Sequence, residues 1–194
     1  MTPRTDWPPD VEVAITAHNN LETLKHALAS VREAGCPNTA IIVVDIFSSD
    51  GTGEYLKAEW AGVRVLRLDY NDGPSPGRNA GIRAARTRFV LLMDADVVLA
   101  PDAVSVLHAA MLADSNVKVG SPIVVHLAHP DTIQYAGGAL HFICEAVNPW
   151  LDRPLSARGL QPLDIGAAPT CALLLDRETA IDVGLFDERY FIGK

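Results

Sequence analysis

The stretch from Phe89 to Val98 constrains the fold of this chain more than any other, because it joins large apolar residues directly to carboxylates. Its opening, Phe-Val-Leu-Leu-Met, is typical of a strand that is covered on both faces, as in the middle of a parallel sheet. Asp94 and Asp96 come directly after it, and residues two apart on an extended backbone point to the same side. The sequence therefore predicts a buried central strand with converging carboxylates at its carboxyl end.

This position suits a ligand site, because open α/β sheets bind ligands beyond the carboxyl ends of their strands. Neighbouring carboxylates repel each other unless a cation lies between them, which favours a hard divalent metal with oxygen ligands. Taken alone, Asp-x-Asp more often marks a turn, with Asp94 ending the strand and Asp96 capping the next segment. The other segments of the chain decide between these interpretations.

Strand and helix patterns alternate at short intervals from Val11 to Val125. This alternation predicts right-handed crossovers and an α/β fold with a mostly parallel central sheet flanked by helices. We expect strands at 11–15, 40–44, 63–68 and 89–93. We expect helices from Leu21 to Gly35, from Thr52 to Trp60, from Arg78 to Ala85 and from Pro101 through Met111, with a turn-rich loop at 69–77.

Regular alternation stops after Val125. Residues 126–168 hold short strand-like pieces, at 133–135 and 139–142, among Pro, Gly and polar residues. We expect a less regular, substrate-facing region there, followed by a buried strand at 171–175 and a short helix at 177–183.

Composition excludes several classes of protein. A net charge of −8 argues against a general nucleic-acid surface. The sequence has no apolar run long enough for a transmembrane segment, and Thr2 to Asp10 is too rich in proline and charge to be a secretory signal. Cys36, Cys144 and Cys171 are odd in number and widely spaced, which favours reduced core thiols. We expect a cytoplasmic protein, with peripheral attachment to a membrane left open.

With these segments placed, the sequence resembles a family 2 glycosyltransferase with the nucleotide-binding GT-A fold. The resemblance rests on five segments in the family's order: 11–21 with its ending His-Asn-Asn-Leu, 41–45 with Ser48-Ser-Asp-Gly-Thr52, Gly77-Arg-Asn-Ala-Gly-Ile82, Asp94-Ala-Asp96, and 184–191. Their order and spacing make the resemblance strong, although no single segment is diagnostic.

The resemblance implies transfer of a sugar, with inversion, from a UDP-, dTDP- or GDP-linked donor to a saccharide, lipid-linked or small-molecule acceptor. It implies a divalent metal, Mn²⁺ or Mg²⁺, bound directly by Asp96, with Asp94 facing the ribose or a metal-bound water. The other donor contacts would be the backbone of Ala17 and His18, the Asp45 carboxylate at the base or ribose, and Arg78, which we expect at a helix start near the phosphates.

The resemblance also implies a division of the chain into an N-terminal tail at 1–10, a donor-binding part at 11–125 and an acceptor-facing part at 126–194. The family's catalytic base should come immediately after Lys194. We therefore leave the catalytic residue unknown and expect the donor-binding part of a longer protein, or a truncated one. Asp187 and Glu188 are assigned to structure and Asp50 to helix capping. Thr170 and Cys171 either border the acceptor pocket or begin a core strand.

Two departures leave the nucleotide base open, since the family usually has Pro at Thr16 and an Asn-Gly-like pair at Ile46-Phe47. A non-catalytic nucleotide-sugar-binding module, or a fragment that lacks the base, is the main alternative. A sugar nucleotidyltransferase or a Rossmann dehydrogenase would need a glycine-rich loop after the first strand, and residues 16–20 contain no glycine.

Overall fold

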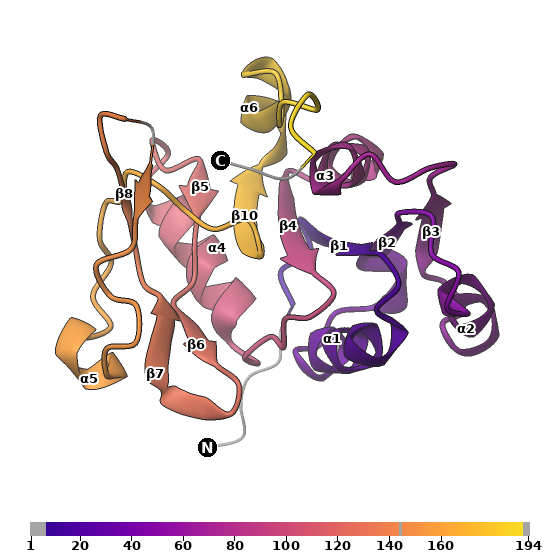
Figure 1. Ribbon diagram of the computed structural model, residues 1–194, viewed down its shortest axis with the longest axis horizontal. Coiled ribbons are helices and arrows are strands. Elements are labelled where there is room, and N and C mark those ends of the chain that lie inside the picture. The colour runs from indigo at the N-terminus through magenta and orange to yellow at the C-terminus, as the bar shows by residue number, and fades with distance from the viewer. Residues whose placement is uncertain (1–6, 144, 192–194) are drawn as a thin grey trace. The chain divides into compact units, whose positions relative to one another are not determined.

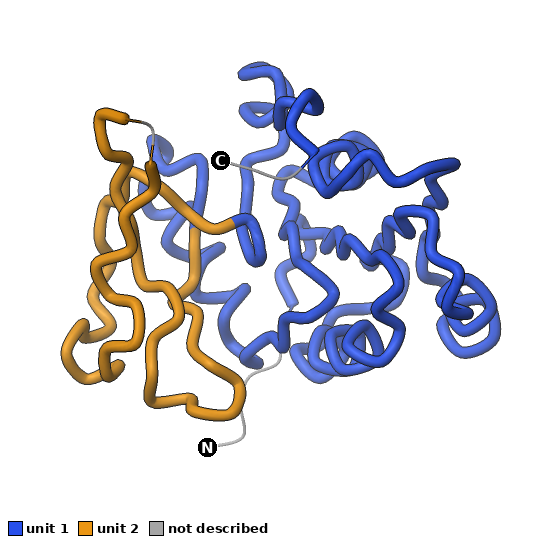
Figure 2. Tube along the Cα trace, viewed as in Figure 1, with its two compact units in different colours: residues 1–120, 170–193 blue, residues 121–169, 194 orange. Residues whose placement is uncertain are grey.

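The computed structural model describes residues 7–143 and 145–191 (Figure 1). These residues form two compact units (Figure 2): unit 1 runs up to residue 120 and resumes at 170, and unit 2 comprises the described residues of 121–169. The expected division placed 126–194 in one part, whereas the chain from Thr170 onward returns to unit 1. Lys194 and the expected position of the base beyond it lie outside the described residues, as do most of the expected N-terminal tail and Cys144.

Unit 1 is built on a six-stranded sheet with the order β3-β2-β1-β4-β10-β5. Its strands are β1 (Val11–Ala17), β2 (Ile41–Asp45), β3 (Arg64–Arg67), β4 (Phe89–Asp94), β5 (Val119–Gly120) and β10 (Ala172–Asp176). The first three and β4 pair in parallel, and β10 pairs antiparallel with both β4 and β5. The prediction of an α/β fold with a mostly parallel central sheet is confirmed.

The predicted central strand lies in the middle of this sheet. Phe89 to Met93 are buried, as are all residues of β1 and β2. Such strands need cover on both faces, and Figure 1 shows α1 (Leu21–Glu33) and α3 (Pro74–Ala84) on opposite sides of the sheet. The apolar face of α1 packs on alternate residues of β1, which places the main core of unit 1 between them.

The remaining helices of unit 1 are α2 (Thr52–Glu59), α4 (Ala103–Ala113) and α6 (Arg177–Asp182), with a short 3₁₀ turn, η1, at Asn38–Ala40. Two predicted helix starts were wrong. Helix α4 begins after Pro101, which lies in the preceding turn. Helix α3 begins at Pro74, inside the predicted loop, because proline suits a first helical position where its missing N–H is not needed.

Helix α3 lies unusually close to the sheet because its inner face carries glycines. A Cβ at Gly81 would lie 2.7 Å from the Ala14 Cβ, and one at Gly77 would lie 2.6 Å from the Ile46 Cδ1. Ile46 could yield by changing rotamer, whereas the Ala14 methyl is fixed to a buried strand. Gly81 therefore sets how closely α3 approaches β1.

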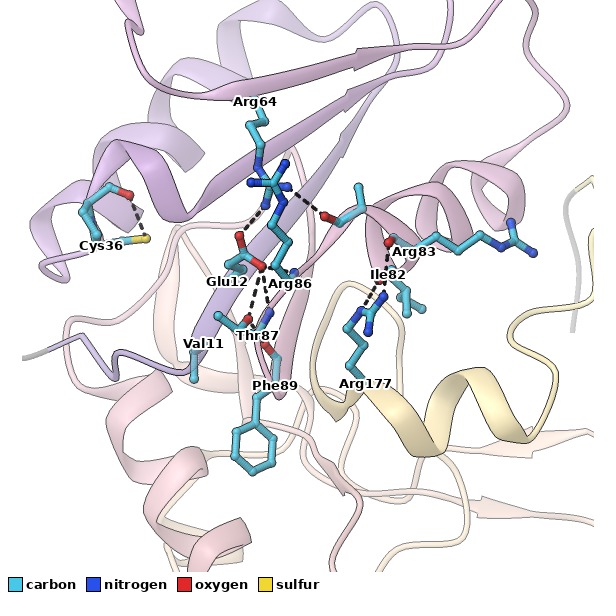
Figure 3. Close-up of polar contacts among 12 residues, drawn as sticks. Val11, Glu12, Cys36, Arg64, Ile82, Arg83, Arg86, Thr87, Phe89 and Arg177 are labelled. Atoms are coloured by element: carbon cyan, nitrogen blue, oxygen red, sulfur yellow. Dashed lines mark hydrogen bonds and ion pairs between the residues drawn. The ribbon is translucent and has the colours of Figure 1, made fainter.

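Two arginines hold the other end of α3 (Figure 3). The Arg64 guanidinium donates to the Ala84 carbonyl, and that of Arg177 donates to the carbonyls of Ile82 and Arg83. Cations at a helix C-terminus satisfy free carbonyls and complement the helix dipole. Arg64 also pairs with the buried Glu12, whose second oxygen accepts from the backbone of the α3–β4 connection. The C-terminal end of α3 is thus fastened to β3, to β1 and to the start of α6.

Unit 2 is less regular, as expected. It contains two small antiparallel sheets, β6 (Val124–His126) with β7 (His129–Tyr135) and β8 (Ala139–Leu140) with β9 (Ala146–Val147), and the single turn of helix α5 (Leu155–Arg158). The predicted piece at 133–135 is the end of the longer strand β7, whereas the predicted piece at 139–142 is a strand only at 139–140.

The described cysteines, Cys36 and Cys171, are free thiols, the first buried and the second partly exposed. Within the described part of the chain, no helix has the length and apolar character needed to cross a bilayer.

We predict that Gly81→Ala lowers the free energy of unfolding, since the overpacking penalty of about 1–3 kcal/mol exceeds the gain of about 1 kcal/mol in helix propensity. Gly53→Ala in α2 is the matched control, because a Cβ there meets no atom within 4 Å. Urea denaturation should show a loss for Gly81→Ala and a small gain for Gly53→Ala. Equal stability changes in the two variants would refute the tight contact.

Candidate functional site

The strand register brings the carboxyl ends of β1, β2 and β4 together. Thr16 lies opposite Asp94, and Ala17 lies opposite Asp45. A cavity of about 340 Å³ opens at this edge, a size suited to a small-molecule ligand. Its lining comes entirely from unit 1: Thr16, Ala17, His18, Asn20, Ile46, Asn71, Gly73, Pro74, Arg78, Asp94, Ala95, Asp96 and Phe191. Of the predicted site residues, Asp45 is the one that does not line it.

Two of the lining residues, Arg78 and Asp94, form an ion pair. Arg78 Nη2 donates to both oxygens of Asp94, at 2.8 Å and 3.0 Å, and the Thr16 hydroxyl donates to Asp94 Oδ1 at 3.2 Å. Arg78 is 9% exposed, and its Nε is buried without an acceptor among the described residues. The cation that offsets the Asp94 charge is therefore Arg78.

The predicted position of Arg78 at a helix start was wrong. It is the fifth residue of α3, and Pro74 and Pro76 at the N-terminus of that helix carry no N–H. The helix terminus is consequently a poor source of phosphate-binding amides. What Arg78 offers to the cavity is its guanidinium.

Asp96 differs from Asp94 in its surroundings. Asp94 is the last residue of β4, whereas Asp96 lies in the turn after that strand, so the turn and not strand alternation brings both to one cavity. Asp96 is exposed, and it accepts no hydrogen bond and forms no ion pair among the described residues. Its carboxylate is free to bind a ligand.

The Asp94 and Asp96 carboxylates fit a metal ion that binds together with its substrate. Residues 7–143 and 145–191 contain no group of three His, Cys, Asp or Glu residues placed to hold a metal ion. Two carboxylates at one cavity, one of them without a partner, match Mg²⁺-type sites, in which one or two carboxylates act together with substrate phosphates and water. A complete protein cage is not required for such a site.

The β1–α1 turn is tied to the loop after β2. His18 Nδ1 donates to the Ile46 carbonyl, and His18 Nε2 accepts from the Asn19 side-chain amide. The Asn19 N–H donates to the Ser48 hydroxyl, and the Asn19 side-chain oxygen accepts from the Ser49 N–H. Both His18 ring nitrogens are thus occupied, which leaves neither of them free to act as a catalytic base.

Phe47 has a left-handed backbone, with φ of 57°, where the resembling family usually carries glycine. Such a conformation costs a residue with a Cβ roughly 1–2 kcal/mol. The loop therefore keeps a glycine-type geometry, and the Arg67 guanidinium lies 5.8 Å from the centre of the Phe47 ring.

Asp50 caps two helices at once, as its predicted structural role requires. Its Oδ2 accepts from the Leu21 N–H at the start of α1, and its Oδ1 accepts from the N–H and hydroxyl of Thr52 in α2. Burial alone raises the pKa of Asp50, but these hydrogen bonds together lower the pKa below its ordinary value.

Asp45 is fully buried, and both of its carboxylate oxygens have partners. Oδ1 accepts from the Ser48 N–H at 2.8 Å, and Oδ2 pairs with Arg67, which also donates to the Ser48 carbonyl. A direct contact between Asp45 and a nucleotide base would require Arg67 to move. The observed contacts give Asp45 the task of shaping the loop that carries Ile46.

Residues 184–191 come after α6 and lie against α3. Asp187 pairs with Arg189, which lowers the pKa of Asp187 to about 2. The Asn79 amide donates to the Glu188 carboxylate, and this hydrogen bond contributes most to the lowered pKa of Glu188. Tyr190 and Phe191 follow these pairs and are not in a strand.

Asn79 and Phe191 were not predicted as site residues. Asn79 belongs to the Arg-Asn segment of the resembling family, and that was the available signal. Nothing in the sequence indicates that residues more than 100 positions apart meet here.

Comparisons with known proteins identify a family for this chain. Residues 12–177 match the model of the family described as "Glycosyl transferase family 2". The "Succinoglycan biosynthesis protein ExoO" of Rhizobium meliloti (strain 1021) is 34% identical over 127 residues, which covers 64% of this chain and 36% of that protein.

Similar solved structures share the fold at low identity. GalNAc-T7, solved with UDP, GalNAc and Mn²⁺, aligns with a TM-score of 0.69 at 20% identity over 95% of this chain and 38% of its own. The mannosyltransferase PcManGT from Pyrobaculum calidifontis, solved with GDP-Man and Mn²⁺, aligns with a TM-score of 0.66 at 18% identity over 95% of this chain and 49% of its own. The chain thus spans between about a third and a half of the length of these proteins.

The contrast between the two cavity carboxylates yields a stability prediction. Asp94→Asn should lower the free energy of unfolding by about 1.5–3 kcal/mol, because it leaves Arg78 buried without a charged partner. Asp96→Asn, the matched control in the same cavity, should stay within about 0.5 kcal/mol of the native protein. Urea denaturation measures both values, and a larger loss for Asp96→Asn would contradict the pairing.

A second prediction concerns pH. Asp50→Ala should cost about 1–2 kcal/mol near neutral pH through loss of the caps. The lowered pKa of Asp50 means that its contribution is present above the unfolded-state pKa of about 3.9 and is lost as pH falls through the folded-state pKa.

Thermal denaturation of the native protein and Asp50→Ala should therefore show a gap that narrows below about pH 4. Asp69→Ala removes an exposed carboxylate without a hydrogen bond or ion pair to the described residues, and it should show no such gap. A gap for Asp50→Ala that persists unchanged at low pH would show that the carboxylate is not the cap.

Proposed function

The chain belongs to glycosyl transferase family 2, and from this membership we propose that it transfers a sugar from a nucleotide-diphosphate donor to an acceptor hydroxyl. One observation carries the proposal: Asp94 is paired with Arg78, while Asp96 faces the same cavity without a partner among the described residues. An exposed carboxylate that faces a cavity without a protein partner is available to bind a metal ion that arrives with a phosphate ligand.

The donor's nucleotide would lie in the cavity beside the β1–α1 turn. The backbone of Ala17 and His18 would border the base, and Ile46 would cover it from the loop after β2. Because Asp45 is buried, we assign it to holding that loop through Ser48 and Arg67. The choice of nucleotide base would then depend on Thr16 and Ile46, two positions at which this chain departs from the usual family residues.

Asp96 would hold a divalent metal, Mn²⁺ or Mg²⁺, together with oxygens of the donor's diphosphate. The metal, when bound, supplies Lewis-acid stabilisation of the charge on the leaving nucleotide. GalNAc-T7 and PcManGT were solved with Mn²⁺ beside UDP and GDP-Man, which supports this assignment.

Arg78 and Thr16 would fix the Asp94 carboxylate so that it faces the ribose or a metal-bound water. Their donors hold both oxygens from behind, which costs no reorganisation when the donor binds. The Arg78 charge offsets that of Asp94, so Asp96 remains as the carboxylate available to a metal.

The acceptor hydroxyl would attack the anomeric carbon directly, with inversion, while a carboxylate removes its proton. The bond from the anomeric carbon to the diphosphate oxygen would break in the same step, and the nucleoside diphosphate would leave. We place that carboxylate after Lys194, because Asp187 and Glu188 are already engaged with Arg189 and with α3. The acceptor would be a saccharide, a lipid-linked group or a small molecule.

We predict that one of UDP, dTDP and GDP binds in the presence of MnCl₂ and not in the presence of a chelator, as measured by calorimetric titration. Asp96→Ala should weaken binding by at least about 10- to 100-fold, since even indirect metal partners contribute that much. The matched control is Asp102→Ala, an exposed carboxylate outside the cavity, which should bind like the native protein.

Two outcomes would overturn the proposal. Binding of no nucleotide under any metal condition would refute the donor site. Equal losses in Asp96→Ala and Asp102→Ala would show that overall charge, and not the Asp96 carboxylate, governs binding.

A further inference from the structure

Asn79 is a buried polar residue whose side-chain hydrogen bonds all go to one segment. It is 1% exposed and lies in the middle of α3. Its Nδ2 donates to the Phe186 carbonyl and to Glu188 Oε1, both at 2.8 Å, and its Oδ1 accepts from the Phe186 N–H at 3.0 Å. The amide thus completes a two-way pairing with the Phe186 backbone, as a neighbouring strand would.

The same segment, residues 184–191, reaches the donor cavity at its far end. Phe191 lines the cavity with Gly73 and Pro74 at the start of α3. Gly73 has φ of +92°, and a Cβ there would lie inside van der Waals distance of the Phe191 carbonyl oxygen. Figure 1 shows the chain after α6 running down to α3. Segment 184–191 is therefore held on α3 by Asn79 and forms a wall of the cavity at Phe191.

Other contacts of this segment are weaker candidates for holding it. The Arg83–Glu188 ion pair spans 3.4 Å between side chains that are 58% and 47% exposed. Exposed pairs of this kind contribute little to stability. The Asp187–Arg189 pair lies within the segment and ties it to nothing else. The Gly184 and Leu185 N–H groups bond back to carbonyls of α6 and hold only the start of the segment. Among the described residues, Asn79 is the buried side chain that joins the rest of the segment to α3.

We propose that Asn79 is a positioning residue of the donor site, which holds segment 184–191 on α3 so that Phe191 closes one side of the nucleotide pocket. The inference rests on the proposed function and adds a residue that touches neither donor nor metal. Asn79 acts on the donor through Phe191, and the two residues should therefore be energetically coupled.

A double-mutant cycle on nucleotide binding tests this coupling. The probe is whichever of UDP, dTDP and GDP binds the native protein most tightly with MnCl₂. Asn79→Ala and Phe191→Ala should each weaken binding about fivefold to tenfold, as expected for one truncated contact at a binding site. The double variant should bind no more weakly than Phe191→Ala alone. A merely structural role of Asn79 would give additive losses.

Limited trypsin digestion without any nucleotide tests whether Asn79 holds segment 184–191 on α3. Asn79→Ala should speed cleavage after Arg189 several-fold relative to cleavage elsewhere in the chain, as read by mass spectrometry, while Phe191→Ala should change it less. Glu188→Gln is the matched control, because its amide oxygen still accepts from Asn79 Nδ2 although the pair with Arg83 is lost. It should match the native protein in both experiments.

Each failure has its own signature. If the native protein binds none of the nucleotides, the proposed function fails and this inference with it. If the native protein binds but Phe191→Ala binds equally well, or the losses add, the proposed function stands and the role of Asn79 is wrong. Should Asn79→Ala fail to fold, Asn79→Ser takes its place in the cycle, and an unchanged affinity in Phe191→Ala still refutes the role of Asn79.

Discussion

The close seating of α3 on the sheet is the constraint on which the rest of unit 1 depends. Gly81 lets the helix approach Ala14, and Arg64 and Arg177 fix its last carbonyls. A helix held at this distance has one orientation about its axis, because rotation would push side chains into β1. The packing of α3 consequently brings Arg78 into contact with Asp94. The net charge of the cavity therefore depends on how this helix packs.

That packing has an electrostatic consequence for any anionic ligand. Arg78 neutralises Asp94, so the Asp96 charge remains uncompensated at the cavity. A nucleotide-diphosphate sugar carries about two negative charges of its own and would be repelled by Asp96 alone. A divalent cation between the two would reverse this repulsion, since a bound ion is often the largest local charge in a site. Metal dependence is thus the expected consequence of a carboxylate left unpaired beside one that is paired.

The sequence was sufficient for the features set by local pattern. The apolar run 89–93 predicted the buried central strand, and Asp50 before Gly-Thr predicted a cap. It was insufficient wherever a partner comes from far along the chain. The pairing of Asp94 with Arg78, the capping of α1 by Asp50 and the contact of Asn79 with Phe186 join segments whose spacing carries no period. The start of α3 was missed because proline and glycine indicate turns and helix N-termini equally well.

The Arg-Asn dipeptide serves two different partners from adjacent positions on one helix. Neighbours on a helix project about 100° apart, so Arg78 and Asn79 cannot share a partner. Arg78 faces the end of β4 while Asn79 faces residues 186–188. One short stretch of a tightly packed helix therefore fixes both the Asp94 carboxylate and the segment that brings Phe191 to the cavity. A shift of α3 would disturb both together, which is how a single packing contact at Gly81 can control the donor site.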